Sequence, residues 1–439
     1  MSWEKITFGE LYKSPTRNGI YKEKSNHGSG VKIVNMGEIF AYDFIGSQDM
    51  QRIELTENEL QNFRLEENDL LFARRSLVES GAGKASIVAN LVEPTTFESS
   101  IIRVRLNAEI CCPLFYLYWL RSLAGRAAIS ALVTGVNVKG IRGSELKDIK
   151  VDYPPIEIQR KISGILKEYD NLIENNQKQI KLLEEAAQRL YKEWFVDLRF
   201  PRYENTPITD GVPQGWKEGT LGEIAFFKRG KTITKDQTCE GMVPVVAGGL
   251  EPAYYHNQSN TASPVITVSG SGANAGFTRM YHTEVWASDC SFVDAQNTDN
   301  IYFAYCVLKN KKSDIDSLQK GAAQPHVYAK DINALEILVP DSLYLAEFEN
   351  LVTPFFEKIK SLYQQIELSK EARDRLLPKL MSGEIDLSDG KQAEILQFPQ
   401  KLSYDEFLSE LGMAARAKSI SDADLRAMYE AYLDDDATE

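Results

Sequence analysis

The stretch Ile156-Glu-Ile-Gln-Arg-Lys-Ile162-Ser-Gly-Ile-Leu166 opens the segment that decides the fold. From this point apolar residues recur in alternating steps of four and three, and the pattern continues for more than four heptads. Such an a/d pattern predicts a long helix with a coiled-coil seam. Its polar member, Asn176, could fix the register of a helix pair at some cost in stability. The seam consists of Ile162, Leu166, Tyr169, Ile173, Asn176, Ile180, Leu183, Ala187, Leu190 and Trp194.

A second helix is predicted 186 residues later. Only Ser369 and Arg373 break its apolar pattern, and two helices of about 35 residues, each roughly 50 Å long, would most simply pack against each other. Pro354 lies inside this pattern, so we expect it to kink the helix or to mark where the helix begins. The second seam consists of Phe348, Val352, Phe355, Ile359, Leu362, Ile366, Ser369, Arg373, Leu376 and Leu380.

The two helices close the two copies of an internal repeat. Trp3-Glu-Lys-Ile-Thr-Phe-Gly-Glu10 returns as Trp216-Lys-Glu-Gly-Thr-Leu-Gly-Glu223, and each copy runs from a strand-rich segment through a proline-containing exit into a helix. We therefore expect an α+β fold with a pseudo-twofold repeat of two mixed, β-rich domains separated by two long helices. The expected boundaries are 1–153 and 204–340 for the domains, 154–203 and 341–385 for the helical regions, and 386–439 for an acidic, helical C-terminal extension.

The net charge of −13 at first argues against a nucleic-acid binder. The excess is local, because residues 384–439 carry a net charge of −9 whereas residues 1–153 are neutral. Contacts with DNA phosphates need only a local basic cluster, so the overall charge does not exclude DNA. The tail is expected to be a solvated appendage, a docking element for a partner, or an acidic arm that competes for a basic groove.

Several features predict the compartment. No apolar run approaches the roughly 20 residues of a membrane span, and the first residues lack the apolar region of a secretory signal. The five cysteines form no Cys-x-x-Cys pair, which fits a reducing environment. We expect a cytoplasmic protein.

Motifs that would indicate catalysis do not hold. Residues 225–232 fit a relaxed phosphate-loop pattern, but two phenylalanines and a Lys-Arg pair do not supply a flexible loop of inward-pointing N–H groups. Val268-Ser-Gly-Ser-Gly272 is similar to a dinucleotide-binding fingerprint, but the following residues continue as a strand, so a hairpin is favoured. The four histidines show no i,i+4 pair, and neither Asn nor Asp precedes Pro154-Pro155, as an adenine methyltransferase motif requires. We expect no catalytic residue, no metal site and no cofactor in this chain.

Polar, glycine-containing loops occur at corresponding places in the two copies. Residues 70–84 and 266–276 each run from a strand through such a loop, and residues 134–142 and 320–326 form a second loop near each exit. Glycine lets a backbone approach phosphate closely, while Arg, Asn and Gln side chains can bond base edges in pairs. A single loop of this kind is most often a solvated turn, but its occurrence twice in register indicates a shared function.

These segments resemble the specificity subunit (HsdS) family of type I restriction–modification systems, over residues 1–383. Leu146-Lys-Asp-Ile-Lys-Val-Asp-Tyr-Pro-Pro155-Ile-Glu-Ile-Gln159-Arg-Lys-Ile162 is similar to the family's Pro-Pro-x-x-Glu-Gln-x-x-Ile element, with Ile158 where Glu is usual. Residues 376–385 are similar to its closing element, and 216–223 to its opening. Gly321-Ala-Ala-Gln324 fits its Gly-x-x-Gln motif, with Asn137 roughly equivalent in the first copy. The second copy departs from the family at Leu345-Ala-Glu347-Phe348, and the acidic tail is not part of the usual core.

The resemblance implies a non-catalytic subunit of a prokaryotic restriction complex. Two target recognition domains would each read one half of a split double-stranded DNA site, and two helices packed as an antiparallel coiled coil would act as a ruler. Two methyltransferase subunits would bring S-adenosylmethionine, and two restriction/translocase subunits would bring ATP and Mg²⁺. The candidate DNA contacts are Arg74, Arg75, Lys84, Asn137, Lys139 and Arg142 in the first domain, and Lys228, Arg229, Lys231, Asn274, Arg279, Gln324 and His326 in the second.

Two alternatives remain open at this point. The chain could be a protein–protein scaffold, with two β-rich modules on a helical arm and no role on DNA. It could also be the specificity subunit of a system that only methylates DNA, as part of a different phage defence.

Overall fold

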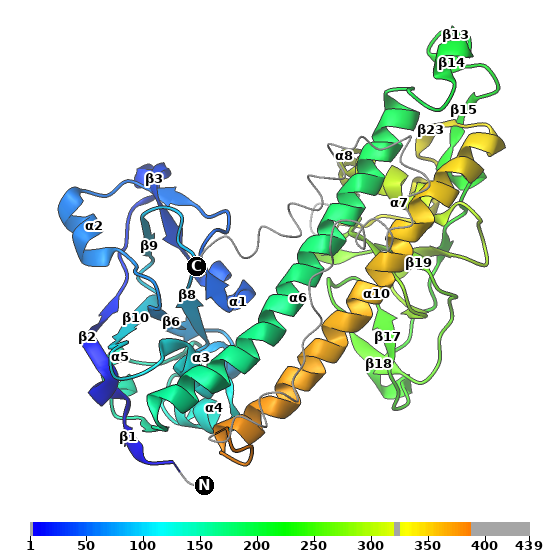
Figure 1. Cartoon of the computed structure of the whole chain (residues 1–439). Coiled ribbons are helices and arrows are strands. Elements are labelled where there is room, and N and C mark those ends of the chain that lie inside the picture. The colour runs from blue at the N-terminus through cyan, green and yellow to red at the C-terminus, as the bar shows by residue number, and fades with distance from the viewer. Residues whose placement is uncertain (1–2, 320–324, 388–439) are drawn as a thin grey trace. The chain divides into compact units, whose positions relative to one another are not determined.

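The computed structural model describes residues 3–319 and 325–387, which form two compact units. Among these residues, unit 1 contains 3–173 and 367–387, and unit 2 contains 174–319 and 325–366. Two long helices, α6 (Ile156–Tyr191) and α10 (Ser342–Met381), belong to both units (Figure 1). Residues 156–173 of α6 and 367–381 of α10 lie in unit 1, and residues 174–191 and 342–366 lie in unit 2. Most of the expected acidic, helical extension, residues 388–439, lies outside the described residues.

Unit 1 is built on a five-stranded sheet in the order β2-β10-β6-β8-β4, in which only the β4–β8 pair is parallel. A three-stranded sheet, β5-β3-β9, and two short strand pairs, β1–β12 and β7–β11, complete its strands. The strands are β1 (Lys5–Thr7), β2 (Tyr12–Asn18), β3 (His27–Val34), β4 (Phe44–Ile45), β5 (Arg52–Ile53), β6 (Leu70–Ala73), β7 (Arg75–Ser76), β8 (Ala85–Val88), β9 (Thr95–Phe97), β10 (Ile101–Leu106), β11 (Lys139–Gly140) and β12 (Lys150–Asp152).

Five short helices accompany these strands: α1 (Met36–Ala41), α2 (Glu57–Phe63), α3 (Pro113–Arg121), α4 (Leu123–Ser130) and α5 (Gly143–Leu146). Local sequence explains where two of them begin. The Thr56 hydroxyl accepts from the N–H of Glu59 (3.3 Å) to cap α2, and the Ser122 hydroxyl accepts from the N–H of Gly125 (3.2 Å) to cap α4. Such caps satisfy N–H groups that the first helical turn leaves without partners.

Both faces of the central strand β6 are buried. Leu70 and Phe72 point into a core shared with α3 and the start of α6, whereas Leu71 and Ala73 point into a second core with α1. Successive side chains of a strand alternate between faces, so an uninterrupted apolar run is the sequence that a strand covered on both sides requires. The helix α3 is buried from Phe115 to Leu120.

Unit 2 contains a four-stranded sheet, β16-β22-β19-β20, a three-stranded sheet, β18-β17-β21, and the strand pairs β13–β14 and β15–β23. Its strands are β13 (Ile208–Thr209), β14 (Val212–Pro213), β15 (Lys217–Thr220), β16 (Lys228–Arg229), β17 (Val243–Val246), β18 (Tyr254–His256), β19 (Val265–Ser269), β20 (Thr278–Tyr281), β21 (Trp286–Ala287), β22 (Cys290–Asp294) and β23 (Glu336–Val339). Its shorter helices are α7 (Ile301–Asn310), α8 (Lys312–Ser317) and α9 (Ala329–Asn333).

Within unit 1, the first half of α6 runs antiparallel to the second half of α10. Ile162 and Leu166 share a core with Leu380 and Met381. Further along α6, the Asp170 carboxylate forms an ion pair with Arg373 and accepts a 2.6 Å hydrogen bond from the Tyr118 hydroxyl of α3. This polar cluster connects both long helices to α3 of the same unit.

Within unit 2, the second half of α6 runs antiparallel to the first half of α10. The Asn176 amide donates to the Gln365 side chain at 3.3 Å, and the Trp194 ring lies 6.1 Å from that of Phe348. Asn176 is buried, so it would be costly without this partner. Of the predicted packing residues in the two units, Leu376 is half-buried, and the others, Ile162, Leu166, Ile173, Asn176, Ile180, Leu183, Leu190, Phe355, Ile359, Leu362 and Ile366, are buried.

Of the two alternatives expected for Pro354, the structure excludes one. The helix begins at Ser342, so Pro354 lies in its interior and does not mark its start. The Asp341 carboxylate accepts from the N–H of Leu343 (2.9 Å) at that start, and Leu345, Phe348 and Val352 are buried before the proline is reached. This capping and burial stabilise the turns that the proline would otherwise disfavour.

No helix in the described ranges is long and apolar enough to cross a membrane.

Candidate nucleic-acid interface

In unit 1, the two polar loops predicted from the sequence lie side by side. The first follows β6 and the second precedes α5, and they are joined by the short β7–β11 ribbon, which places Arg75 opposite Gly140 and Ser76 opposite Lys139. The N–H of Ile141 also donates to the carbonyl of Arg74 at 3.1 Å. Residues 63 and 65 positions apart in the sequence therefore present their side chains from one backbone ribbon.

A glycine holds this loop pair against α4. Gly83 has φ +69°, and its N–H donates to the carbonyl of Ala73 at 2.8 Å. A Cβ atom at this position would stand 2.4 Å from Cγ2 of Ile129 and 3.3 Å from Cδ1 of Ile141. Both the left-handed backbone and the close contact require glycine.

Unit 2 repeats this arrangement with different side chains. The N–H of Val327 donates to the carbonyl of Gly270 at 3.1 Å, and Gly276, with φ +85°, would bring a Cβ atom within 2.8 Å of Cγ2 of Ile315. Ile129 and Ile315, like Ile141 and Val327, are 186 residues apart, which is the offset of the sequence repeat. The residues that pack against the two loops are therefore themselves equivalent members of the repeat.

The candidate residues of unit 1 differ in how free their side chains are. Arg75, Asn137 and Arg142 are exposed, and Lys139 is half-buried. Arg142 approaches Glu145 at 3.6 Å on the surface, a contact that contributes little to stability. Arg74 reaches the carbonyl of Ser99 at 3.4 Å, and Lys84 donates to the carbonyl of Phe40 at 2.7 Å, so these two side chains also support the local backbone.

In unit 2 one candidate from outside the two loops, Arg229, lies next to the first of them. Arg229 lies beside Gly270, where an added Cβ atom would be 3.2 Å from its Nη1 atom. It forms an ion pair with Asp289, whose second carboxylate oxygen accepts from the Ser271 hydroxyl. Ser271 pairs with His326, and the His326 ring stacks on Tyr328 with centroids 6.0 Å apart. A cation, a hydroxyl and an imidazole therefore gather at one loop.

The remaining candidates of unit 2 are placed differently. Asn274 lies in the same loop, in the turn Gly272–Asn274. Lys228 is hydrogen-bonded to Asn297, and the Lys231 ammonium lies 5.9 Å from the centroid of the Trp286 ring. Arg279, on β20, donates to the carbonyl of Leu250 at 2.9 Å and faces Glu251 at 3.5 Å. Gln324 lies outside the described residues.

Sequence reasoning did not single out some residues at these loops. Asp289 and Ser271 position Arg229, but 60 residues separate Asp289 from that arginine, so no local pattern could reveal the contact. Leu77, Val78 and Val136 are exposed apolar side chains beside the candidate arginines. The signal available for Leu77 and Val78 was that two apolar residues directly follow Arg-Arg-Ser in a polar loop.

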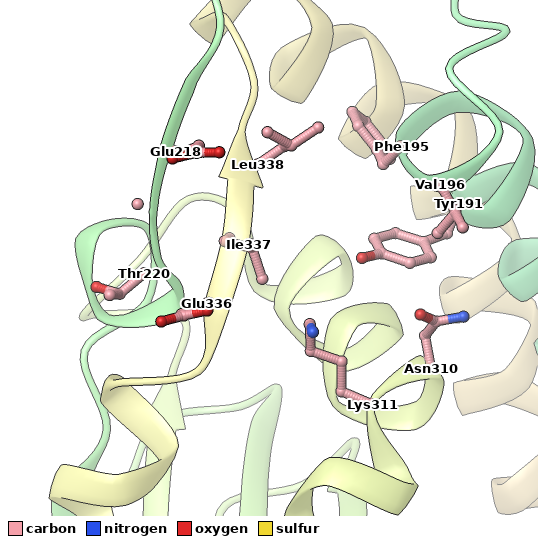
Figure 2. A pocket seen from close by; sticks show the side chains of 11 residues that line it. Tyr191, Phe195, Val196, Glu218, Thr220, Asn310, Lys311, Glu336, Ile337 and Leu338 are labelled. Atoms are coloured by element: carbon pink, nitrogen blue, oxygen red, sulfur yellow. The ribbon is translucent and has the colours of Figure 1, made fainter. Parts of the chain in front are cut away.

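Unit 2 also holds an open pocket of about 670 Å³ between the end of α6, the junction of α7 and α8, and β23. Figure 2 shows Tyr191 and Lys311 on opposite sides of this space, with β23 between it and β15. Burial raises the pKa of the Tyr191 phenol, and Lys311 is engaged by Asp314 at 3.0 Å. Among the described residues, the lining of this pocket contains neither histidine nor cysteine.

Among the described residues, no group of three or more His, Cys, Asp or Glu side chains is arranged to hold a metal ion. The buried thiols of Cys290 and Cys306 have pKa values raised by burial, which suits inert core residues rather than nucleophiles.

Comparison with known proteins bears on both the loops and the helices. The model of the type I restriction modification DNA specificity domain matches residues 1–185 and 213–346. The MjaIX specificity subunit of a type I restriction enzyme from Methanocaldococcus jannaschii is 29% identical over 307 residues, which covers 63% of this chain and 69% of that protein. The HindI specificity subunit from Haemophilus influenzae is 20% identical, covering 87% and 99%.

A solved structure agrees with the fold. The S subunit of a type I restriction–modification system from M. genitalium superposes with a TM-score of 0.54 at 19% sequence identity, covering 87% of this chain and 96% of that one. Since the specificity-domain model matches both sequence copies and well over half of the residues, the chain belongs to the type I restriction–modification DNA specificity family.

Proposed function

We propose that this chain supplies the DNA sequence specificity of a type I restriction–modification complex and reads a split target. The observation that carries the proposal is the duplicated loop pair. Gly83 with Ile129 and Gly276 with Ile315 seat equivalent loops, and each loop presents basic or polar side chains. Two similar frames with different surface residues suit two half-sites of different sequence.

The proposed recognition domains are residues 1–153 and 204–340, and each would read one half-site. Within them, Arg75, Lys139 and Arg142 in the first domain and Arg229, Asn274 and His326 in the second are the side chains best placed to contact DNA. Arginine and lysine would position the duplex through its phosphates, and arginine, asparagine and histidine could bond base edges.

The two long helices are proposed to act as a ruler that fixes the distance between the half-sites. Support comes from polar pairs that would set their register: Asp170 with Arg373 in unit 1 and Asn176 with Gln365 in unit 2. Asp170 and Asn176 are both buried, so a slipped register would leave their polar groups without partners and is disfavoured.

Catalysis is proposed to reside in other subunits. Two methyltransferase subunits would bind S-adenosylmethionine, and two restriction/translocase subunits would use ATP and Mg²⁺. A chain with two similar units is suited to two identical partners, because each unit can present an equivalent surface.

A binding titration tests the proposal. The chain would be combined with its methyltransferase subunit and titrated with a duplex that carries the target, found by mapping methylated adenines, and with a shuffled duplex. We expect at least a hundredfold preference for the target at about 0.15 M salt, within the usual range for specific DNA binding. Equal binding to both duplexes would refute the proposal and favour a protein scaffold.

A neighbouring-gene survey separates the two remaining forms of the function. A nuclease/translocase gene beside the methyltransferase gene supports a restriction system, and its absence there supports a system that only methylates.

A further inference from the structure

The end of the β7–β11 ribbon in unit 1 displays apolar side chains to solvent. Leu77 is 84% exposed, Val78 60%, Val136 91% and Val138 49%. Ser76 lies opposite Lys139, so the segment that follows β7 and the segment that precedes β11 leave the ribbon at the same end. We call Leu77, Val78, Val136 and Val138 the apolar tip.

The backbone of the apolar tip is held in place. Thr134 and Gly140 exchange two hydrogen bonds of 2.9 Å, which close the loop that carries Val136 and Val138. Gly135 has φ +105° inside this loop, where a Cβ atom would stand 2.1 Å from the carbonyl oxygen of Val138. The loop therefore has a defined shape although its apolar side chains are not buried.

The other side of the apolar tip is held by α4. Arg126 donates to the carbonyl of Ser80 at 2.8 Å, and the Ser130 hydroxyl donates to the Glu79 carboxylate at 2.9 Å. These bonds attach the segment that follows Leu77 and Val78 to a helix. Exposing large apolar side chains on a fixed backbone gains nothing for folding, so their use lies in contact with another molecule.

The charges around the apolar tip indicate which molecule. Arg75 and Lys139 flank it on the ribbon, and Arg142 follows two residues after β11 with its side chain 76% exposed. The nearest carboxylates, Glu79 and Glu145, are engaged by Ser130 and Arg142. Four apolar side chains within a basic frame are too few for a stable protein interface, which buries about 800 Å² on each partner, but they match a polyanion with a local apolar group.

DNA has such a group in its major groove. The C5-methyl of thymine is an apolar group among the donors and acceptors of the base edges, and the groove, about 12 Å wide, admits a two-stranded ribbon. We propose that the apolar tip enters the major groove and recognises thymine through this methyl group, while Arg75, Lys139 and Arg142 contact the phosphates on either side. This inference rests on the proposed function, which it makes specific for unit 1.

Among the described residues, unit 2 shows no such tip at its first loop, whereas the counterpart of the loop that carries Val136 lies largely outside them. The first loop, residues 270–276, reads Gly-Ser-Gly-Ala-Asn-Ala-Gly and contains no large apolar side chain. Loss of a thymine methyl group should therefore weaken binding in the half-site that unit 1 reads. In the other half-site, this loop of unit 2 should make no such contact.

A chemical double-mutant cycle tests the inference. The full chain with its methyltransferase subunit binds the mapped target, in which each thymine is replaced in turn by deoxyuridine, which lacks only the methyl group. At one or more positions of one half-site we expect the affinity of the wild-type complex to fall by about three- to tenfold, as the burial of one methyl group implies. For Leu77→Ala with Val136→Ala, the same replacement should change the affinity by less than twofold.

Val92→Ala is the matched control, because Val92 is 72% exposed in unit 1 but lies between β8 and β9, outside the two loops that form the ribbon and the apolar tip. It should keep the full response to deoxyuridine. A wild-type complex that is insensitive to deoxyuridine at every position, or a tip variant as sensitive as wild type, would overturn the inference. So would increased fluorescence of 2-aminopurine placed beside the sensitive thymine and away from the methylated adenine, which the methyltransferase subunit itself would unstack, because it would indicate a wedge between bases. Failure of the wild-type complex to prefer its target would instead overturn the proposed function.

Discussion

Replacing the glycines that seat the two loops gives a graded prediction. Gly272, Gly276 and Gly83 all have positive φ, at +79°, +85° and +69°. An added Cβ atom would meet nothing within 4 Å at Gly272, would stand 2.8 Å from Ile315 at Gly276, and 2.4 Å from Ile129 at Gly83. Alanine at the three positions therefore imposes a similar backbone penalty and a steric penalty that increases in this order.

The magnitudes follow from these contacts. The left-handed backbone costs a residue with a side chain about 1–2 kcal/mol. Overpacking of a well-filled site adds about 1–3 kcal/mol, and the overlapping Cγ2 atoms belong to isoleucine, whose branched side chain has little freedom to move. We expect Gly272→Ala to lose about 1–2 kcal/mol of unfolding free energy, Gly276→Ala about 2–4 kcal/mol, and Gly83→Ala a value at or above the upper end of that range.

Calorimetric melting of the full chain measures the order. For units of this size, 1 kcal/mol corresponds to a shift in Tm of about 2–4 °C. The double variant Gly276→Ala with Ile315→Ala should lose at least 1 kcal/mol less than the sum of the single variants, because the small side chain at 315 removes the overlap. Equal losses for Gly272→Ala and Gly276→Ala, or a smaller loss for Gly83→Ala than for Gly276→Ala, would refute the idea that these glycines seat the loops.

Three further predictions concern the helices and the candidate cations. Burial raises the pKa of Glu349 to about 8, although the N–H groups of Phe303 and Tyr302 oppose the shift. Because this carboxyl ionises near pH 4.5 in the unfolded chain and only near pH 8 in the folded one, the unfolding free energy falls as pH rises between these values. Relative to wild type, Glu349→Gln should therefore gain about 3 kcal/mol between pH 5 and pH 8 in denaturation experiments, whereas Glu347→Gln, at an exposed partner of Arg202, should show no such trend. Asp170→Ala should lose about 1–3 kcal/mol of unfolding free energy, because it removes one partner of the half-buried Arg373 and leaves the buried Tyr118 hydroxyl without its acceptor. Asp374→Ala, at an exposed partner of the same arginine, should lose less than about 1 kcal/mol. Equal losses would contradict the stabilising role given to Asp170. Arg75→Ala should weaken binding to target and shuffled duplexes alike and lower the salt slope by about one, and a loss confined to the target would show that Arg75 reads a base.

Helix length gives a further, geometric prediction. Adding one heptad to α6 and one to α10 at facing positions should lengthen the spacer of the methylated site and leave both half-sites unchanged. A change in the half-site sequences would contradict the ruler proposal.

The long helices show what periodicity can and cannot predict. The four-and-three spacing identified seam positions that the structure buries over most of α6, and the 186-residue offset carried the pattern to α10. Pro354 does not mark the start of α10, because the burial of Phe348 and Val352 stabilises the helix on its N-terminal side. Local preference is weak evidence where tertiary packing is extensive.

The loops show a different limit. Glycine and polar residues at corresponding places predicted two loop pairs, and the contacts of Gly83 and Gly276 show a shared frame. The ribbon β7–β11 has two residues in each strand, too few for an alternating pattern to be recognised. The placement of Arg229 beside Gly270 depends on the pairing of β16 with β22, and no local pattern in the sequence specifies that contact.

The most direct measurement is a map of methylated adenines in cells that express this chain with its methyltransferase subunit, repeated with a chimera. In the chimera, residues 204–340 are replaced by the corresponding segment of a relative with a different target. We predict a bipartite site in the first map, and in the second map a site with one half unchanged and the other half replaced. No sequence-specific methylation with the wild-type chain, or a chimera that leaves both half-sites unchanged, would contradict the account.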